Sequence, residues 1–242
     1  DQYVDKFVVV EATRDHAGNL KKLNFDISKF KKFKNKIIYH VVEDIPEKVE
    51  KYKKGWSPNF YRENFHRNSI QKAIEKCDLN DLILISDVDE IPNLENLNKI
   101  KIKNFALFRQ KNYLYKLNLL SDENWLGSAA CYKKYLKSPQ WLRNKRFLRR
   151  GFIRKLFFKT QIIENGGWHF SFLKNPEDIV KKMKSYGHGD LQSLSDLNFI
   201  KKNIAEKKFF LNTDIDLKKV NINEDLPSHI IENKEYYKEW IV

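Results

Sequence analysis

The sequence predicts an α/β protein with a Rossmann-like, mostly parallel central sheet and helices on both of its faces. Short β-branched runs alternate with helix signals in the first half of the chain, which is the order typical of parallel sheets. The 242 residues are 41% apolar and 14% aromatic, so the chain has enough apolar surface for a core and is not disordered. We expect a single domain over residues 1–242, with mixed strand pairing in its second half.

Local signals place the elements in order. Ser57 and Pro58 combine a capping hydroxyl with a first-turn proline, and Asn175 and Pro176 repeat this signal. Apolar runs without helical spacing predict strands. The predicted elements are strands at 6–10, 36–42 and 82–85, one or two strands within 105–117, a strand at 125–132, a loop at 12–22, and helices at 59–77, 175–186 and 190–208.

Charge and cysteine content narrow the class of protein. Lysine and arginine total 46 against 32 aspartate and glutamate, which gives a formal net charge of +14. A basic chain of this kind is compatible with a soluble surface, an acidic substrate, an anionic membrane or a nucleic acid. We find no recognisable nucleic-acid-binding module. Cys77 and Cys131 do not form a disulfide framework, so we expect reduced thiols.

The sharpest feature is the segment from residue 81 to 92, where four apolar residues run directly into Asp87, Asp89, Glu90 and Pro92. Alternate side chains of an extended segment point the same way, so Asp87 and Asp89 can meet one divalent cation. Phosphatases of the haloacid-dehalogenase type and metal-dependent sugar transferases both place an Asp-x-Asp after an apolar strand. The position on the third predicted strand and the following Glu-Ile-Pro favour the second class. The alternative is an acidic turn that caps a helix.

Four segments taken together resemble the family-seventeen glycosyltransferases. They are Phe-Val-Val-Val-Glu-Ala-Thr at 7–13, the acidic segment at 81–92, Gly-Gly-Trp-His-Phe-Ser at 166–171, and the closing segment at 226–233. The resemblance implies the A-type glycosyltransferase fold. The family carries a further strand and helix before the position of Phe7, and the chain begins at Asp1 rather than at a methionine. We therefore expect the domain to be truncated at its N-terminus.

The resemblance also implies the reaction. It is an inverting transfer of N-acetylglucosamine from UDP-N-acetylglucosamine to a sugar hydroxyl of a glycan acceptor, with Mn²⁺ or Mg²⁺ as the cofactor. Such a reaction needs positive charge beside the leaving diphosphate, a carboxylate base for the acceptor hydroxyl, and exclusion of water. Two rivals stay open: the same scaffold with another nucleotide-sugar donor, and a basic nucleic-acid-binding protein in which the carboxylates are structural.

Each step of this reaction has candidate residues. Asp87, Asp89 and His169 are the predicted metal ligands, with His188 as a competitor of His169. The predicted donor-binding residues are Glu11 and Thr13 for the uracil and ribose, Arg67 for the diphosphate, Glu90 beside the metal or the sugar, and Trp125 and Trp168 for stacking on sugar rings. Glu123 and Asp190 are the candidate catalytic bases.

The densest basic run, at residues 143–155, has three interpretations. It forms a solvated basic face, a loop over the donor diphosphate, or a contact with an anionic membrane or a lipid-linked acceptor. No stretch of the chain approaches the roughly 20 apolar residues that span a bilayer. We therefore expect a location in the cytoplasm or at the cytoplasmic face of a membrane. The low ratio of arginine to lysine and the abundance of asparagine and isoleucine indicate an AT-rich genome, so we expect a bacterial or viral source.

Overall fold

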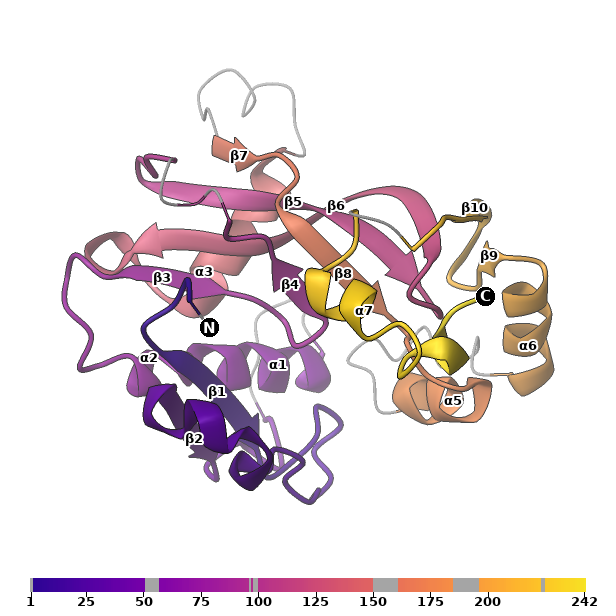
Figure 1. Cartoon of the computed structure of the whole chain (residues 1–242). Helices are drawn as coiled ribbons and strands as arrows, with labels where there is room; N and C mark the ends of the chain where they lie inside the picture. Colours follow the sequence, from indigo (N-terminus) through magenta and orange to yellow (C-terminus); the bar gives the residue numbers. More distant parts are fainter. Residues whose placement is uncertain are drawn as a thin grey trace.

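The computed structural model describes residues 2–50, 57–95, 97, 100–149, 161–184, 196–222 and 225–242 (Figure 1). The strands form a two-stranded sheet, β1-β2, and an eight-stranded sheet ordered β4-β8-β5-β6-β10-β9, in which β3 also pairs with β6 and β7 with β5. The strands are β1 (Phe7–Ala12), β2 (Ile37–Val42), β3 (Leu82–Ile85), β4 (Glu90–Pro92), β5 (Phe105–Leu114), β6 (Leu119–Tyr132), β7 (Gln161–Ile163), β8 (Gly167–Ser171), β9 (Lys208–Phe209) and β10 (Asn212–Lys219).

The prediction of a Rossmann-like, mostly parallel sheet flanked by helices, and with it the A-type glycosyltransferase fold, is wrong. In the large sheet, β6 pairs antiparallel with β3, β5 and β10, and β4 pairs antiparallel with β8. Only β7 and β8 run parallel to β5. The reason lies in the connections: four residues join β5 to β6, whereas a parallel crossover needs a dozen or more. The separate β1-β2 pair has the expected parallel arrangement.

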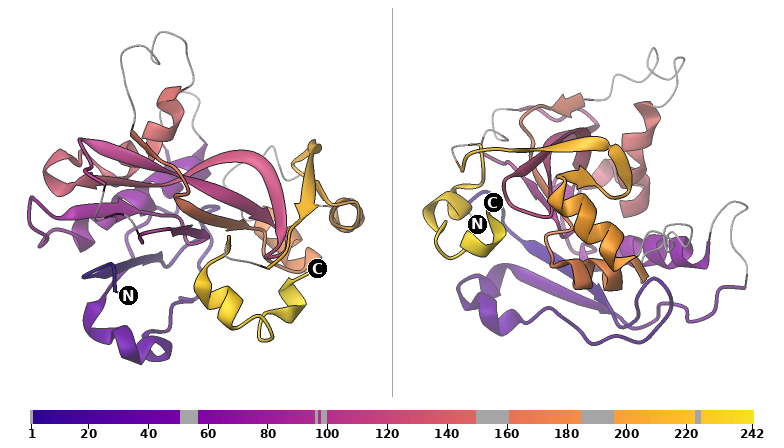
Figure 2. Two further views of the ribbon diagram at one scale, coloured as in Figure 1. Left: turned by 45° about the horizontal axis from the view of Figure 1, so that its top comes forward. Right: turned by 90° about the vertical axis from the view of Figure 1, so that its right-hand side faces the viewer.

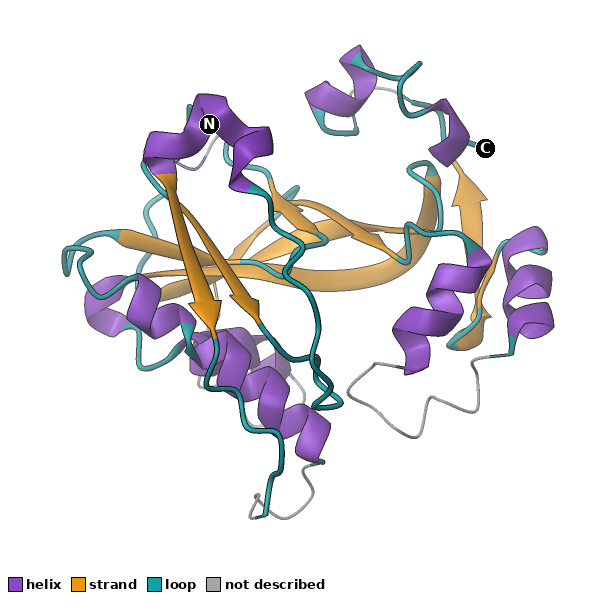
Figure 3. Cartoon of the chain, turned by 90° about the horizontal axis from the view of Figure 1, so that it is seen from below, coloured by secondary structure: helices purple, strands orange, loops and turns teal. Residues whose placement is uncertain are grey.

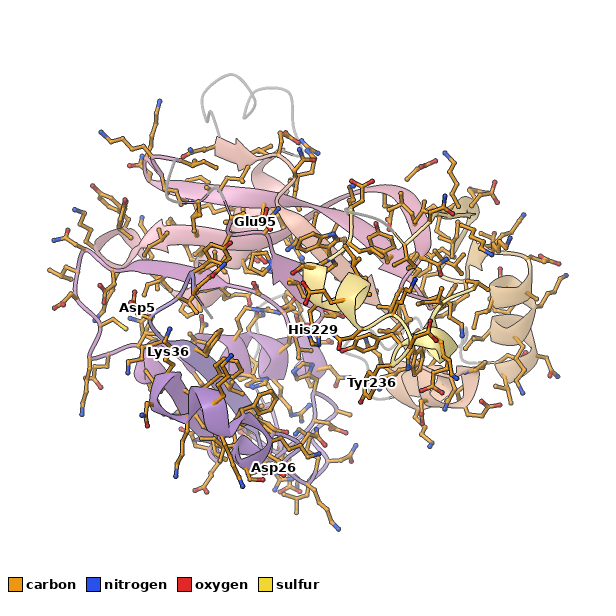
Figure 4. All side chains as sticks on the ribbon, viewed as in Figure 1. Asp5, Asp26, Lys36, Glu95, His229 and Tyr236 are labelled. Atoms are coloured by element: carbon orange, nitrogen blue, oxygen red, sulfur yellow. The ribbon has the colours of Figure 1, made fainter. Side chains whose placement is uncertain are left out.

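The helices are few and short. The α-helices are α1 (Pro58–Asn68), α2 (Ile70–Ala73), α3 (Pro139–Arg143), α5 (Pro176–Lys184), α6 (Leu197–Ala205) and α7 (Ser228–Glu232), and the 3₁₀ helices are η1 (Ile27–Lys36), η3 (Lys133–Tyr135), η4 (Asn144–Arg149) and η6 (Lys238–Trp240). Asp26, labelled in Figure 4, begins η1 by accepting a hydrogen bond from the Ser28 backbone N–H at 2.9 Å. No helix in the described part of the chain is long and apolar enough to cross a membrane.

The predicted helix over 59–77 is two helices, because the chain departs from regular helix at Ser69. Its start is confirmed: the Ser57 hydroxyl accepts a hydrogen bond from the Phe60 backbone N–H at 3.1 Å. The Ser69 hydroxyl bonds back to the Phe65 carbonyl at 3.0 Å, which is a local interaction that competes with continued helix. In the second half, α5 ends at Lys184 and α6 begins at Leu197, while residues 185–195 lie outside the described residues.

Separate apolar clusters pack against different parts of the large sheet. One cluster joins β3, β5 and β6 to α2 and α3, and includes the free thiol Cys131. A second joins the ends of β5 and β6 to α5, α6 and β10. Seen from below, the β1-β2 sheet lies in front of the large sheet, and α5 and α6 stand at the far end of it (Figure 3). The left view of Figure 2 shows the same separation of the N-terminal part from α6.

A glycine lets β4 and β8 approach closely enough to form the site. Gly167 has a φ of 123°, and a Cβ there would lie 2.1 Å from the Ile91 carbonyl oxygen. Pro92 therefore pairs with Gly167, and this register places Glu90 opposite His169. The segments 81–92 and 166–171, which are far apart in the sequence, are neighbouring strands of one sheet.

Candidate active site

The three carboxylates of the acidic segment lie where β3 turns into β4. The turn closes with a hydrogen bond from the Glu90 backbone N–H to the Asp87 carbonyl at 3.0 Å. The Asp87 backbone N–H in turn donates to Glu90 Oε2 at 3.0 Å. The three side chains do not share one direction, since Glu90 is buried whereas Asp87 and Asp89 keep part of their surface exposed. Each carboxylate therefore has its own set of partners.

Arg143, at the end of α3, holds Glu90 and Asp87 together. It is only 1% exposed. Its guanidinium lies 2.5 and 3.0 Å from the two Glu90 carboxylate oxygens and 2.6 Å from Asp87 Oδ2, and it also donates to the Gly127 carbonyl at 2.5 Å. Two parallel N–H···O bonds fix the orientation of both groups. Glu90 is thus a structural anchor of the acidic segment, and Asp87 is tied to the same anchor.

Arg67, on α1, holds Asp87 from the other side. Its guanidinium donates to Asp87 Oδ1 at 3.2 Å, to Glu63 Oε1 at 3.0 Å and to Gln140 Oε1 at 2.5 Å. Burial alone would raise the pKa of Asp87, but the guanidinium groups of Arg143 and Arg67 outweigh it and hold this pKa below its usual range. Asp87 is therefore a carboxylate shared by two arginines.

His169 and Asp89 form a second group beside the first. His169 Nδ1 lies 2.8 Å from Asn112 Oδ1, which is an acceptor, so Nδ1 donates this hydrogen bond, and Nε2 faces Asp89 Oδ1 at 3.7 Å. Lys182 Nζ approaches Asp89 Oδ2 to 3.8 Å. Burial opposes ionisation of Asp89, yet His169 and Lys182 lower its pKa below the usual range. Asn112 thereby fixes the ring orientation of His169.

A divalent cation fits this second group in part. Asp89, in the turn before β4, offers an oxygen, and His169, on β8, offers an imidazole nitrogen and has the orienting partner that metal-bound histidines usually have. Within the described residues, however, no three His, Cys, Asp or Glu side chains are grouped to hold a metal. Asp87 is engaged by Arg67 and Arg143 instead. The remaining ligands of a cation here would have to come from the substrate or water, which is common for Mg²⁺.

Trp125, on β6, links the two groups. Its indole N–H donates to Glu90 Oε1 at 3.1 Å, and its ring stacks on that of His169 with centroids 4.1 Å apart and planes 4° apart. Arg146, on η4, lies with its guanidinium carbon 5.6 Å from the centre of the same indole ring. The ring that we expected to stack on a sugar thus contacts other groups of the cluster.

Glu123, one of the two predicted bases, lies on a bulge of β6. Gln110 pairs with Trp125 and Asn112 with Ser121, so three residues of β6 stand opposite one residue of β5. Glu123 Oε2 accepts a hydrogen bond from the Asn112 amide at 2.9 Å, which connects it to His169. Glu123 also lines a shallow cavity of about 280 Å³ with Asp122 and residues 214–216. The other predicted base, Asp190, and His188 lie outside the described residues.

Glu11 and Thr13 stand at the carboxyl end of β1. The Glu11 carboxylate accepts hydrogen bonds from Lys21 Nζ at 2.7 Å, from the Asn24 and Phe25 backbone N–H groups at 2.7 and 3.0 Å, and from the Tyr39 hydroxyl at 3.0 Å. Burial raises its pKa, but these donors outweigh burial and bring the pKa to about 2. Contact of Glu11 and Thr13 with the uracil and ribose stays a prediction.

The structure does not bring Trp168 into the cluster. Consecutive side chains of a strand point to opposite faces, so Trp168 faces away from its neighbour His169. Its indole N–H donates to the Asp225 carbonyl at 2.5 Å, and its ring packs beside the C-terminal segment. Stacking of Trp168 on a sugar ring stays a prediction, and it would have to occur on the other side of β8.

Sequence reasoning missed Arg143 and Asn112, although each had a signal. Ser138 and Pro139 repeat the cap-plus-proline pattern, and the Ser138 hydroxyl accepts from the Trp141 backbone N–H at 3.1 Å. This pattern predicts the start of α3, a helix of five residues that ends at Arg143. Arg143 therefore belongs to a helix and not to a solvated basic face. Asn112 is the last of four consecutive polar residues, 109–112, in β5, and it is buried. Buried polar residues of this kind need partners, and here the partners are site residues.

The comparisons with known proteins agree with the four segments. The family model described as glycosyltransferase family 17 matches residues 1–239. The β-1,4-mannosyl-glycoprotein 4-β-N-acetylglucosaminyltransferases of Rattus norvegicus and Mus musculus are each 22% identical to the chain over 267 residues. These alignments cover 97% of this chain and 49% of each relative, so the chain spans about half the length of the curated relatives. No solved structure matches the chain. The chain belongs to glycosyltransferase family 17.

Proposed function

We propose that this domain transfers N-acetylglucosamine from UDP-N-acetylglucosamine to a hydroxyl of a glycan, with inversion at the anomeric carbon and with Mn²⁺ or Mg²⁺ as cofactor. The observation that carries the proposal is the cluster around Asp87, Asp89 and Glu90, in which three arginines and a histidine surround three carboxylates. Family membership supplies the reaction class, and the printed name of the two relatives supplies the sugar.

The charge distribution supports a nucleoside diphosphate as the leaving group. Bond cleavage places negative charge on the departing phosphate, and fixed positive groups stabilise that charge without reorganising. Arg67, Arg143 and Arg146 converge on the acidic turn. Arg143 and Arg67 hold the carboxylates in place, so that the turn keeps its shape when an anionic substrate binds.

Asp89 and His169 are the residues that would hold the cation. Its chemistry would be to neutralise charge on the diphosphate as the glycosidic bond to it breaks. Asn112 Oδ1 accepts a hydrogen bond from His169 Nδ1–H, which directs the other ring nitrogen, Nε2, toward a ligand. Trp125 packs flat on the imidazole and restricts its rotation.

Glu123 is the base that we propose for the acceptor hydroxyl. A general base has to lie within hydrogen-bond reach of the hydroxyl, directly or through one water. Glu123 borders the shallow cavity on one side and bonds to Asn112 on the other, so it joins a surface accessible to an acceptor to the His169 group. Asp190 stays the alternative base.

The test is a panel of nucleotide sugars with a panel of oligosaccharide acceptors, in which UDP release is measured and product linkage is assigned by NMR. We expect UDP-N-acetylglucosamine to be consumed in the presence of Mn²⁺ and to give a β-linked product, and we expect Glu123→Gln to slow transfer by about 10²- to 10⁴-fold. An α-linked product would contradict inversion. Preference for another sugar nucleotide would establish the alternative donor, and no turnover of any donor would contradict the proposal.

A further inference from the structure

Arg146 is a partly buried cation beside the acidic turn. It lies on η4, three residues after Arg143, with its guanidinium carbon 5.6 Å from the centre of the Trp125 ring and 4.8 Å from that of Phe147. Its Nε is buried and has no hydrogen-bond partner. Stacking against aromatic rings fixes the plane of a guanidinium and leaves its N–H groups directed outward along that plane.

The nearby carboxylates are committed to other arginines. Glu90 pairs with Arg143, and Asp87 pairs with Arg143 and Arg67. Among the described residues, no carboxylate forms an ion pair with Arg146. Burial disfavours its charge, Arg143 repels it, and together they lower the pKa of Arg146 to about 10 even though Asp87 and Glu90 act in the opposite direction. Within the described part of the chain, Arg146 thus keeps a positive charge in a place where it lacks a close counter-ion.

Buried charges in native proteins are normally paired, so an unpaired one needs an explanation. A bound anion supplies that explanation. We propose that Arg146 is the side chain that receives the diphosphate of the donor, and this proposal rests on the function proposed above. The guanidinium fork matches phosphate oxygens, which accept two parallel hydrogen bonds. Arg67, our candidate from the sequence, already donates to Glu63, Asp87 and Gln140.

The test is calorimetric titration of three probes into the wild type and two variants. UDP and uridine are titrated with Mn²⁺ present, and inorganic pyrophosphate without metal. Arg146→Gln removes the proposed anion ligand. Lys145→Gln is the matched control, because it removes the same charge from the same segment, but Lys145 lies over the rings of Trp141 and Phe105, at 4.1 and 5.1 Å.

We expect Arg146→Gln to weaken the binding of UDP and of pyrophosphate by about 10- to 100-fold, which corresponds to the loss of one or two charge-assisted hydrogen bonds. Uridine binding should not change, and Lys145→Gln should bind all three probes within about threefold of the wild type, since its charge is screened by solvent. Without ligand, Arg146→Gln should melt no lower than the wild type, because the cation it removes has no close counter-ion. A merely structural arginine would lower the melting temperature.

The outcomes separate this proposal from the proposed function. If Arg146→Gln binds UDP and pyrophosphate like the wild type, or weakens uridine as much as UDP, the role of Arg146 is refuted and the donor assignment stands. If the wild type binds pyrophosphate but not UDP, the donor assignment fails, and loss of pyrophosphate binding in Arg146→Gln still supports the anion site. If the wild type binds neither, both proposals fail.

Discussion

Replacing Arg143 with methionine tests whether one buried arginine organises the acidic turn. Methionine fills a similar volume without charge, so the change leaves the Glu90 carboxylate, whose side chain is 0% exposed, without its cation. It also removes one of the two arginines on Asp87. Breaking a buried ion pair by removing one partner costs about 3–5 kcal/mol, because the remaining charge is buried alone. We expect Arg143→Met to lower the free energy of unfolding by this amount.

A double-mutant cycle with Glu90→Gln isolates the pair. Glutamine keeps a carbonyl oxygen for the Trp125 indole N–H but carries no charge. The double variant Arg143→Met with Glu90→Gln should therefore lose less stability than the sum of the two single variants, by about 1–3 kcal/mol. Urea denaturation followed by tryptophan fluorescence and by circular dichroism measures all four proteins, and coincident transitions justify the two-state treatment.

The matched control is an exposed ion pair of the same protein. Lys218 and Asp122 lie 2.9 Å apart with side chains 66% and 69% exposed, and Lys218→Met should change stability by less than about 1 kcal/mol. Additive losses in the cycle, or an Arg143→Met variant as stable as the control, would refute the claim that this ion pair holds the turn.

Three other variants test separate parts of the structure. Glu11→Gln should lower the free energy of unfolding at neutral pH. The difference from the wild type should shrink as the pH falls from about 4.5 to about 2, because the pKa of Glu11 in the folded protein lies below the ordinary value and the stabilisation is lost as Glu11 protonates. A difference that stays constant with pH in urea titrations would contradict this. Gly167→Ala should cost more than about 1 kcal/mol, since it combines a positive φ with a Cβ placed against the Ile91 carbonyl, and an unchanged melting temperature would refute the close approach of β4 and β8. Asn112→Ala should weaken Mn²⁺ binding by about 10- to 100-fold in a calorimetric titration because His169 loses its orienting partner, and an unchanged affinity would argue against a metal at this histidine.

Local signals in the sequence predicted the positions of many elements but not their pairing. The Ser57 cap, the strand at 82–85 and the carboxylates that follow it are contiguous in the sequence, so their pattern was visible. The β5-β6 hairpin was not, because its turn contains no glycine and Tyr115 adopts a φ of 65° there without a turn signal. Because this hairpin was not recognised, the alternation of strands and helices in the first half of the chain was interpreted as a parallel sheet.

The candidate site was predictable to a similar extent. The family resemblance is confirmed by the match over residues 1–239, and it identified the two segments that form β4 and β8. The ion pairs of Arg143 with Asp87 and Glu90 span 56 and 53 residues of sequence, so only the tertiary structure brings them together. Binding of a membrane and the cytoplasmic location stay predictions.

The most direct test of the central claim is calorimetric titration of UDP with and without Mn²⁺, into the wild type and into Asp89→Asn. Asp89 is the better target than Asp87, because a change at Asp87 also removes a partner of Arg143 and Arg67. We predict that Mn²⁺ strengthens UDP binding to the wild type and that Asp89→Asn loses this effect while keeping the wild-type melting temperature within a few degrees. Two results would contradict a metal–nucleotide site at Asp89 and His169. One is a UDP affinity that does not change with Mn²⁺, and the other is an Asp89→Asn variant whose UDP affinity rises with Mn²⁺ as in the wild type.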